Sequence, residues 1–304
     1  MKSTITAIAI ATGLLLGSAH THAGNMETVS GANGVNLAVY ETGNPEGPPV
    51  VFIHGFTMNH LAWEDQYNGP LADEFRIIAL DLRGHGGSDK PLEPEQYGDY
   101  TLWADDINAV IRAKELDQPV LVGWSMAGVL IASYLAKHGD DDISGVAFNG
   151  SFTGRTTSEG ESVFEDELLP HLQNMAERDP KTSIDATRAF VGMLTANELD
   201  PETFSTLLAS SMMVPPQVRG AIVAMELGIP DEALTDITAP VLVIHGTKDA
   251  MIKPAAAEHI AGTFPNAELH LYDGIGHTPQ MEAPDRFNSD LKAFLRDTLV
   301  ENAR

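Results

Sequence analysis

The chain has 304 residues, of which 43% are hydrophobic and 20% charged, proportions typical of a globular protein rather than a disordered chain. Acidic residues number 43 against 18 basic ones, giving a formal net charge of −25 at pH 7. This charge argues against nucleic acid or an anionic membrane surface as a partner. The absence of cysteine excludes disulfides, thiol catalysis and cysteine-ligated metal sites.

The first 23 residues have the pattern of a secretory signal peptide. Lys2 precedes an apolar stretch over residues 5–16, and small residues then lead to a cleavage site after Ala23, with Ala19 as a second candidate. The apolar stretch is shorter than the roughly 20 residues that a membrane-spanning helix needs. A buried N-terminal helix or a membrane anchor is the alternative. We expect residues 1–23 to be removed, the protein to be periplasmic or extracellular, and the mature chain not to insert stably into a membrane.

Strand and helix patterns alternate along the rest of the chain. Short apolar runs predict buried parallel strands at 49–54, 75–80, 119–122, 143–148, 241–244 and 269–272. Helical patterns follow at about 101–116, 126–137, 254–263 and 284–299. Thr101 is the expected N-cap of the first of these helices, and Pro254 and Pro284 suit first turns. The alternation predicts an α/β fold with a mostly parallel sheet.

One segment, residues 151–235, interrupts this alternation. It has helical spacing and no strand pattern, and Asp200-Pro201-Glu202 is typical of a helix start. We interpret it as a helical cap inserted into a core formed by residues 24–150 and 236–304. Methionine suits an adaptable apolar pocket, although core packing is its commoner role. The substrate-binding candidates in the cap and in the loops at the strand ends are Met58, Trp124, Met212, Met213 and Met251.

A nucleophile elbow is predicted between the strand at 119–122 and the helix that follows it. The sequence there is Gly123-Trp124-Ser125-Met126-Ala127-Gly128. A sharp strand-to-helix turn of this kind lifts a serine above the sheet and needs small residues two positions to either side. Position 127 is Ala where Gly is usual, but Ala is small enough for the turn. Ser125 is therefore the candidate nucleophile.

An oxyanion hole is expected beside this serine. It requires two backbone N–H groups that point at the developing negative charge. Met126 supplies one, at the start of its helix, and Phe56 in His54-Gly55-Phe56 is the candidate for the other. An ordinary strand-to-helix turn, with His54 only packing, is the alternative reading of the second segment.

Asp249 and His277 follow the predicted strands at 241–244 and 269–272, and so should lie at the same edge of the sheet as Ser125. A serine is a weak nucleophile unless an imidazole accepts its proton, and a carboxylate must orient that imidazole. Asn149, not an acid, follows the strand at 143–148, which favours Asp249 as the third member. Together Ser125, Asp249 and His277 form the predicted catalytic triad, in the chain order of α/β-hydrolases.

Across essentially the whole mature chain, the sequence resembles the α/β-hydrolase superfamily. Besides the motifs above, residues 81–88 (Asp-Leu-Arg-Gly-His-Gly-Gly-Ser) are similar to the family's loop after the strand that precedes the nucleophile elbow. Residues 276–284, together with Phe287, are similar to the region around the family's catalytic histidine. The resemblance implies an eight-stranded, mostly parallel sheet flanked by helices with an inserted helical cap. It also implies that no cofactor is used, and that acyl groups pass to water through an acyl-serine.

By pattern, small-ester hydrolases and cofactor-free haloperoxidase or perhydrolase-like esterases are the most similar subgroups, so an ester-like small molecule is the expected substrate. Serine at position 125 argues against haloalkane dehalogenases and epoxide hydrolases, which place Asp there. Lactonases and carbon–carbon-bond hydrolases share the triad and stay open, as does a non-catalytic ligand-binding homologue. The histidines have no metal-site spacing such as H-E-x-x-H, and the sequence indicates no oligomeric state.

We predict that the exported protein begins at or near Gly24, because cleavage after Ala23 follows the small-residue end of the signal pattern. N-terminal sequencing of protein recovered from the periplasm or the medium measures this directly. Recovery of the protein only from the cytoplasm, with Met1 retained, would contradict it.

Overall fold

The computed structural model describes residues 24–225 and 228–300, so the predicted signal peptide lies outside the described residues. An eight-stranded sheet has the strand order β1-β2-β4-β3-β5-β6-β7-β8. Its strands are β1 (Asn25–Ser30), β2 (Asn36–Gly43), β3 (Pro49–Ile53), β4 (Arg76–Leu80), β5 (Val120–Trp124), β6 (Gly145–Asn149), β7 (Val241–Gly246) and β8 (Ala267–Tyr272). β3 to β8 pair in parallel and β2 is antiparallel to both its neighbours, which confirms the predicted fold class.

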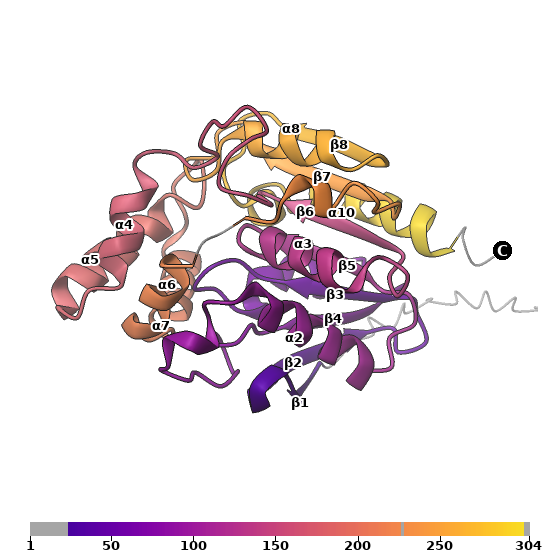
Figure 1. The fold of residues 1–304 in the computed structure, drawn as a ribbon, viewed down its shortest axis with the longest axis horizontal. Helices are drawn as coiled ribbons and strands as arrows, with labels where there is room; N and C mark the ends of the chain where they lie inside the picture. The colour runs from indigo at the N-terminus through magenta and orange to yellow at the C-terminus, as the bar shows by residue number, and fades with distance from the viewer. Residues whose placement is uncertain (1–23, 226–227, 301–304) are drawn as a thin grey trace, which may run out of the picture.

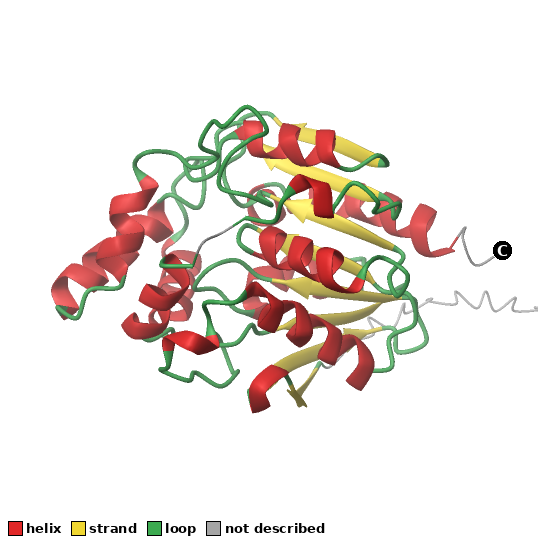
Figure 2. Cartoon of the chain, in the orientation of Figure 1, coloured by secondary structure: helices red, strands yellow, loops and turns green. Residues whose placement is uncertain are grey.

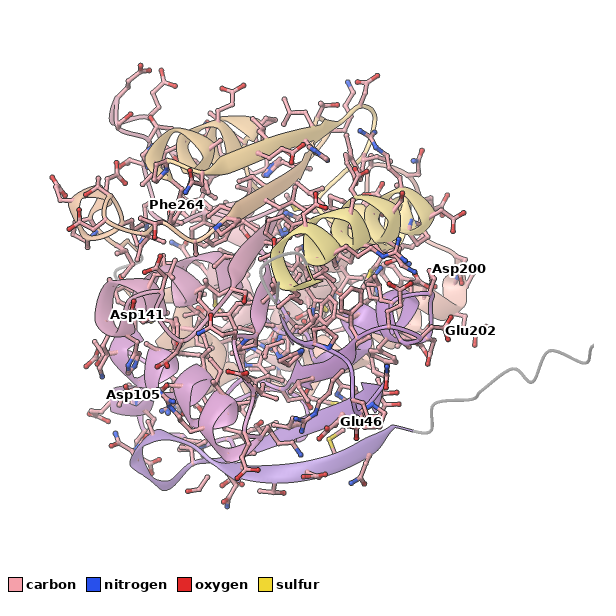
Figure 3. The ribbon with its side chains drawn as sticks, turned by 90° about the vertical axis from the view of Figure 1, so that its right-hand side faces the viewer. Glu46, Asp105, Asp141, Asp200, Glu202 and Phe264 are labelled. Carbon is pink, nitrogen blue, oxygen red and sulfur yellow. The ribbon has the colours of Figure 1, made fainter. Side chains whose placement is uncertain are left out.

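Helices cover both faces of this sheet. On the face towards the viewer in Figure 1, α2 (Tyr100–Ala113) packs against α3 (Ala127–His138), while α8 (Pro254–Thr263) packs on β7 and β8. In Figure 3 the yellow helix α10 (Pro284–Leu295) lies across the sheet from the magenta α2 and α3. The short helices α1 (Glu64–Tyr67) and α9 (Pro279–Glu282) pack beside α10. The 3₁₀ and π turns are η1 (Ala32–Gly34), η2 (His60–Trp63), η3 (Pro94–Gln96), η4 (Asp231–Ala233) and η5 (Arg296–Val300).

The six predicted strands correspond to β3 through β8, and the antiparallel strands β1 and β2 were not among them. The predicted N-cap of α2 is wrong. Asp99 is the N-cap, because its Oδ1 accepts the backbone N–H of Thr101 at 2.8 Å, and Thr101 itself lies inside the first turn. A carboxylate also suits the positive end of the helix dipole.

Four helices lie between β6 and β7 in the chain, and we call them the inserted helices: α4 (Leu168–Met175), α5 (Pro180–Gly192), α6 (Pro201–Met212) and α7 (Pro216–Val223). They gather at the end of the sheet towards which the parallel strands point (Figure 1). The predicted helix start at Asp200 is confirmed, since its Oδ1 accepts the backbone N–H groups of Glu202 and Thr203, each at 3.0 Å.

The negative charge lies mainly on the outside of the molecule. The exposed carboxylates Glu46, Asp141, Asp200 and Glu202 lie at its periphery in Figure 3. One buried charge pair lies inside: the fully buried Arg83 guanidinium makes two hydrogen bonds to the equally buried Asp106, at 2.6 and 2.8 Å. Among the helices of the described residues, none is long and apolar enough to cross a membrane.

Candidate active site

Ser125 occupies a sharp turn between β5 and α3. Its φ of +57° is in the left-handed region, which residues other than glycine rarely adopt. Two backbone hydrogen bonds hold the turn: Ser125 N–H donates to the Asn149 carbonyl at 3.0 Å, and Gly128 N–H donates to the Ser125 carbonyl at 2.9 Å. The side chain of Ser125 is consequently presented at the carboxyl edge of the sheet, as the nucleophile-elbow pattern predicts.

Small residues are required around this turn. A Cβ at Gly123 would lie 2.5 Å from Ile131 Cδ1, and a Cβ at Gly55 would lie 2.9 Å from Ser125 Cβ. Ala127 is fully buried, so the alanine at this position fits a turn that usually contains glycine. Gly123 therefore lets β5 pack closely against α3, and Gly55 lets its loop approach Ser125.

His277 links the serine to a carboxylate. Its Nε2 lies 2.8 Å from Ser125 Oγ, and its Nδ1 lies 2.7 Å from Asp249 Oδ2. The three side chains come from loops that follow β5, β7 and β8 (green in Figure 2), so distant parts of the sequence meet at one edge of the sheet. With Nδ1 donating to Asp249, Nε2 is left to accept the serine proton.

Asp249 is held in place as a buried anion. Its Oδ1 accepts the backbone N–H groups of Met251 and Ile252 at 2.8 and 2.9 Å. Burial by itself raises the pKa of the Asp249 carboxyl, but the charge of His277 and hydrogen bonds from His245 and His277 outweigh it and hold that pKa well below its usual range. The carboxylate is therefore ionised at neutral pH.

His245 is a residue of this site that the sequence interpretation missed. It lies at the end of β7, fully buried, with Nε2 3.2 Å from Asp249 Oδ2 and 3.0 Å from the Ile252 carbonyl. One imidazole therefore braces both the carboxylate and the loop that carries it. The only signal in the sequence was its spacing of four residues before the predicted acid.

The backbone N–H groups of the two predicted oxyanion-hole residues lie beside the serine. Met126 immediately follows Ser125 at the start of α3, and Phe56 follows Gly55, where an added Cβ would lie 2.9 Å from Ser125 Cβ. Within residues 24–225 and 228–300, neither N–H has a protein acceptor. Two such groups are free to bind an oxygen atom of a ligand.

Ser125 and His277 line a narrow pocket with a volume of about 70 Å³, which we call the catalytic pocket. At roughly 10–15 Å³ per water molecule this space holds about five to seven waters. The inserted helices α4, α5 and α7 supply part of its wall. Besides Ser125 and His277, the full set of lining residues is Phe56, Met126, Phe152, Arg155, Phe164, Leu168, Leu169, Leu172, Phe190, Ile222, Val223, Met251 and Ile252.

Of the five predicted substrate-binding residues, only Met251 lines this pocket. Trp124 is buried below it, where its indole N–H donates to the His277 carbonyl at 2.8 Å, and Met58 packs in the core beside a different cavity. Met212 and Met213 lie at the end of α6, with 38% and 51% of their surface exposed. Neither of these two methionines lines the catalytic pocket.

Asn149 and Gln280 form a polar support behind the site, with Asn149 Nδ2 donating to Gln280 Oε1 at 2.6 Å. The described residues contain no group of three or more histidine, aspartate or glutamate side chains that could hold a metal ion.

Comparison with known proteins identifies the relatives of this arrangement. Residues 48–284 match the sequence profile of the alpha/beta hydrolase fold, which confirms the resemblance. A crystal structure of a provisionally assigned aryl esterase from Burkholderia cenocepacia is 35% identical, superposes with a TM-score of 0.85, and the match covers 91% of this chain and all of that one.

Two further relatives have other activities in their names. A non-heme chloroperoxidase of Kitasatospora aureofaciens is 30% identical over 261 residues, which are 82% of this chain and 93% of that protein. The structure of an enzyme that degrades N-acyl homoserine lactones is 29% identical with a TM-score of 0.73, covering 88% of this chain and 100% of that one.

Two buried histidines next to the site make stability depend on pH. The Nδ1 of His54 bonds to the Gly55 carbonyl at 2.8 Å, and its Nε2 accepts the Leu82 N–H at 3.0 Å, so the neutral ring satisfies both contacts. Burial lowers the pKa of His54 to about 4 and that of His85 to about 3. Between about pH 6.5 and pH 4 the unfolded chain therefore takes up protons that the folded chain does not.

We predict that the free energy of unfolding falls as pH drops below about 6.5, by up to about 1.4 kcal/mol per pH unit for each of these two imidazoles. Urea unfolding at a series of pH values between 7.5 and 4.5 measures the slope. His54→Asn should make the slope shallower, whereas His171→Asn, the same change on α4 outside the core, should leave it as in the parent. A slope that is equal in all three proteins would refute this origin.

Proposed function

The chain belongs to the α/β-hydrolase fold family, and we propose that it is a serine esterase that hydrolyses carboxylic esters of small to medium apolar substrates. The observation that carries this proposal is the pair of hydrogen bonds that joins Asp249, His277 and Ser125 at the catalytic pocket. The inserted helices are, in this proposal, a cap that shapes the pocket.

In the first half of the proposed reaction, Ser125 Oγ attacks the ester carbonyl carbon while His277 Nε2 accepts the hydroxyl proton. The carbonyl oxygen becomes an oxyanion and accepts hydrogen bonds from the N–H groups of Phe56 and Met126. When this intermediate collapses, the carbon–oxygen bond to the alcohol breaks and His277 gives its proton to the departing alkoxide. Asp249 stabilises the imidazolium in between.

In the second half, water attacks the acyl-serine with His277 as the base. The bond to Ser125 Oγ breaks, the serine regains a proton from His277, and the acid leaves as a carboxylate. The overall reaction needs no oxidant, reductant or metal, because the atoms of the ester and one water molecule account for all atoms of the acid and the alcohol.

Two activities with the same acyl-serine are supported by particular relatives. A lactone is a cyclic ester, and the similarity to the enzyme that degrades N-acyl homoserine lactones supports lactone hydrolysis as a second candidate. The similarity to the chloroperoxidase supports attack of the acyl-serine by hydrogen peroxide in place of water. Parallel assays with a p-nitrophenyl ester, a homoserine lactone, a carbon–carbon diketone and added peroxide rank these reactions.

We expect Ser125→Ala and His277→Ala each to lower kcat by on the order of 10⁴–10⁶, and the double variant to lower it no further, because nucleophile and base act as a unit. Asp249→Asn leaves the serine and the histidine in place and should lower kcat by a smaller factor, about 10⁴. Hydrolysis of p-nitrophenyl butyrate measures the losses, with circular dichroism as the control for folding. Full activity of Ser125→Ala would exclude the serine mechanism, and failure of a fluorophosphonate to label Ser125 would point to a binding protein.

The proposed cap leads to a prediction about chain length. Leu172 of α4 lines the catalytic pocket, so Leu172→Trp should fill it and shift kcat/KM towards shorter acyl chains, by about 1–3 kcal/mol of discrimination for each methylene excluded. A series of p-nitrophenyl esters from acetate to octanoate gives the profile. Met213→Trp is the matched control, since Met213 is exposed and away from the pocket. An unchanged profile for Leu172→Trp would mean that the acyl chain lies elsewhere.

A further inference from the structure

Among the described residues that line the catalytic pocket, Arg155 is the one arginine, lysine, aspartate or glutamate. Apart from Ser125 and His277, every other lining residue is apolar. The guanidinium carbon of Arg155 lies 5.8 Å from the ring centroid of Phe164, another lining residue, and the side chain is exposed to solvent. The contact with Phe164 thus places a cation beside an apolar pocket.

Arg155 also has no anionic partner within residues 24–225 and 228–300. Most other arginines of the described chain pair with a carboxylate: Arg76, Arg83, Arg112, Arg188, Arg286 and Arg296. Acidic residues outnumber basic ones by 43 to 18, so an arginine readily finds a protein carboxylate. The guanidinium at the catalytic pocket is therefore available to an anion of a ligand.

The backbone around Arg155 is fixed to the loop that carries Asp249. Val163 N–H donates to the Arg155 carbonyl at 3.1 Å, and Lys253 N–H donates to the Val163 carbonyl at 2.8 Å. Glu165 N–H donates to the Met251 carbonyl at 3.0 Å. The position of Arg155 relative to the triad is thus set by main-chain contacts between the two loops.

We propose that the substrate is an ester whose acyl chain ends in a carboxylate, bound by the Arg155 guanidinium. This inference rests on the proposed esterase function and specifies its substrate class. The apolar wall holds the methylene groups, the ester carbonyl lies at Ser125, and the planar guanidinium donates two parallel N–H bonds to the terminal carboxylate. Hydrolysis then releases a dicarboxylate and an alcohol.

The test compares monomethyl esters of straight-chain dicarboxylic acids with their terminal amides, which have nearly the same shape but no charge. We expect the parent enzyme to hydrolyse the carboxylate series with a kcat/KM about ten to a hundred times that of the amide series at the best chain length. Released methanol or product acid gives both rates. A neutral p-nitrophenyl ester is assayed in parallel.

Arg155→Met should remove the preference for the carboxylate, measured within that variant as the ratio of kcat/KM for a carboxylate ester to kcat/KM for its matched amide. Arg155→Lys should keep part of the preference. The matched control is Arg178→Met. Arg178 is an exposed arginine between α4 and α5 that does not line the pocket, so this variant removes the same charge elsewhere. It should keep the parent's preference.

The outcomes separate the two proposals. Hydrolysis of neutral esters without any preference for the carboxylate, or a preference that survives in Arg155→Met, overturns the role of Arg155 and leaves the esterase proposal standing. If no ester is hydrolysed, including the neutral p-nitrophenyl ester, the esterase proposal fails and the substrate class fails with it.

Discussion

The left-handed backbone conformation of Ser125 is the constraint on which the site depends. Holding a non-glycine residue at a positive φ costs on the order of 1–3 kcal/mol, so the surrounding structure must compensate. Here the Asn149 carbonyl on the neighbouring strand accepts the Ser125 N–H, and α3 begins immediately afterwards. The tight turn presents Oγ at the carboxyl edge of the sheet and leaves the Met126 N–H without an acceptor among the described residues. The same strained turn thus presents the proposed nucleophile and one proposed oxyanion donor together.

Sheet topology then decides which side chains can meet this serine. Asp249 and His277 follow the neighbouring strands β7 and β8, whereas β6 and β7 lie between β8 and β5, so His277 reaches Ser125 across the end of β6. A Cβ at Gly150 would lie 2.8 Å from the His277 carbonyl, and the glycine lets the histidine loop pass over β6. The triad therefore forms where the loops after β5, β7 and β8 meet at the end of β6.

The parallel strands and the residues of the triad were predictable because each leaves a local signal. A strand covered on both faces is a continuous apolar run, and Ser125, Asp249 and His277 each follow one. β1 lacks that signal, since Val29 is its one buried residue, and β2 mixes buried residues with the half-buried Tyr40 and Glu41. The pocket wall could not be predicted, because helical periodicity does not tell which face of an inserted helix meets the sheet.

Charge has different effects at different distances in this molecule. The excess of carboxylates lies mainly outside and repels anions at long range, but at physiological ionic strength that repulsion is screened beyond about 8 Å. Inside the site, the ionised Asp249 is compensated by two imidazoles and two backbone N–H groups, so it presents little net field to the pocket. Among the described residues that line the pocket, the Arg155 guanidinium is the one permanent charge. A small anion that diffuses to the pocket thus meets a local cation on a globally negative protein.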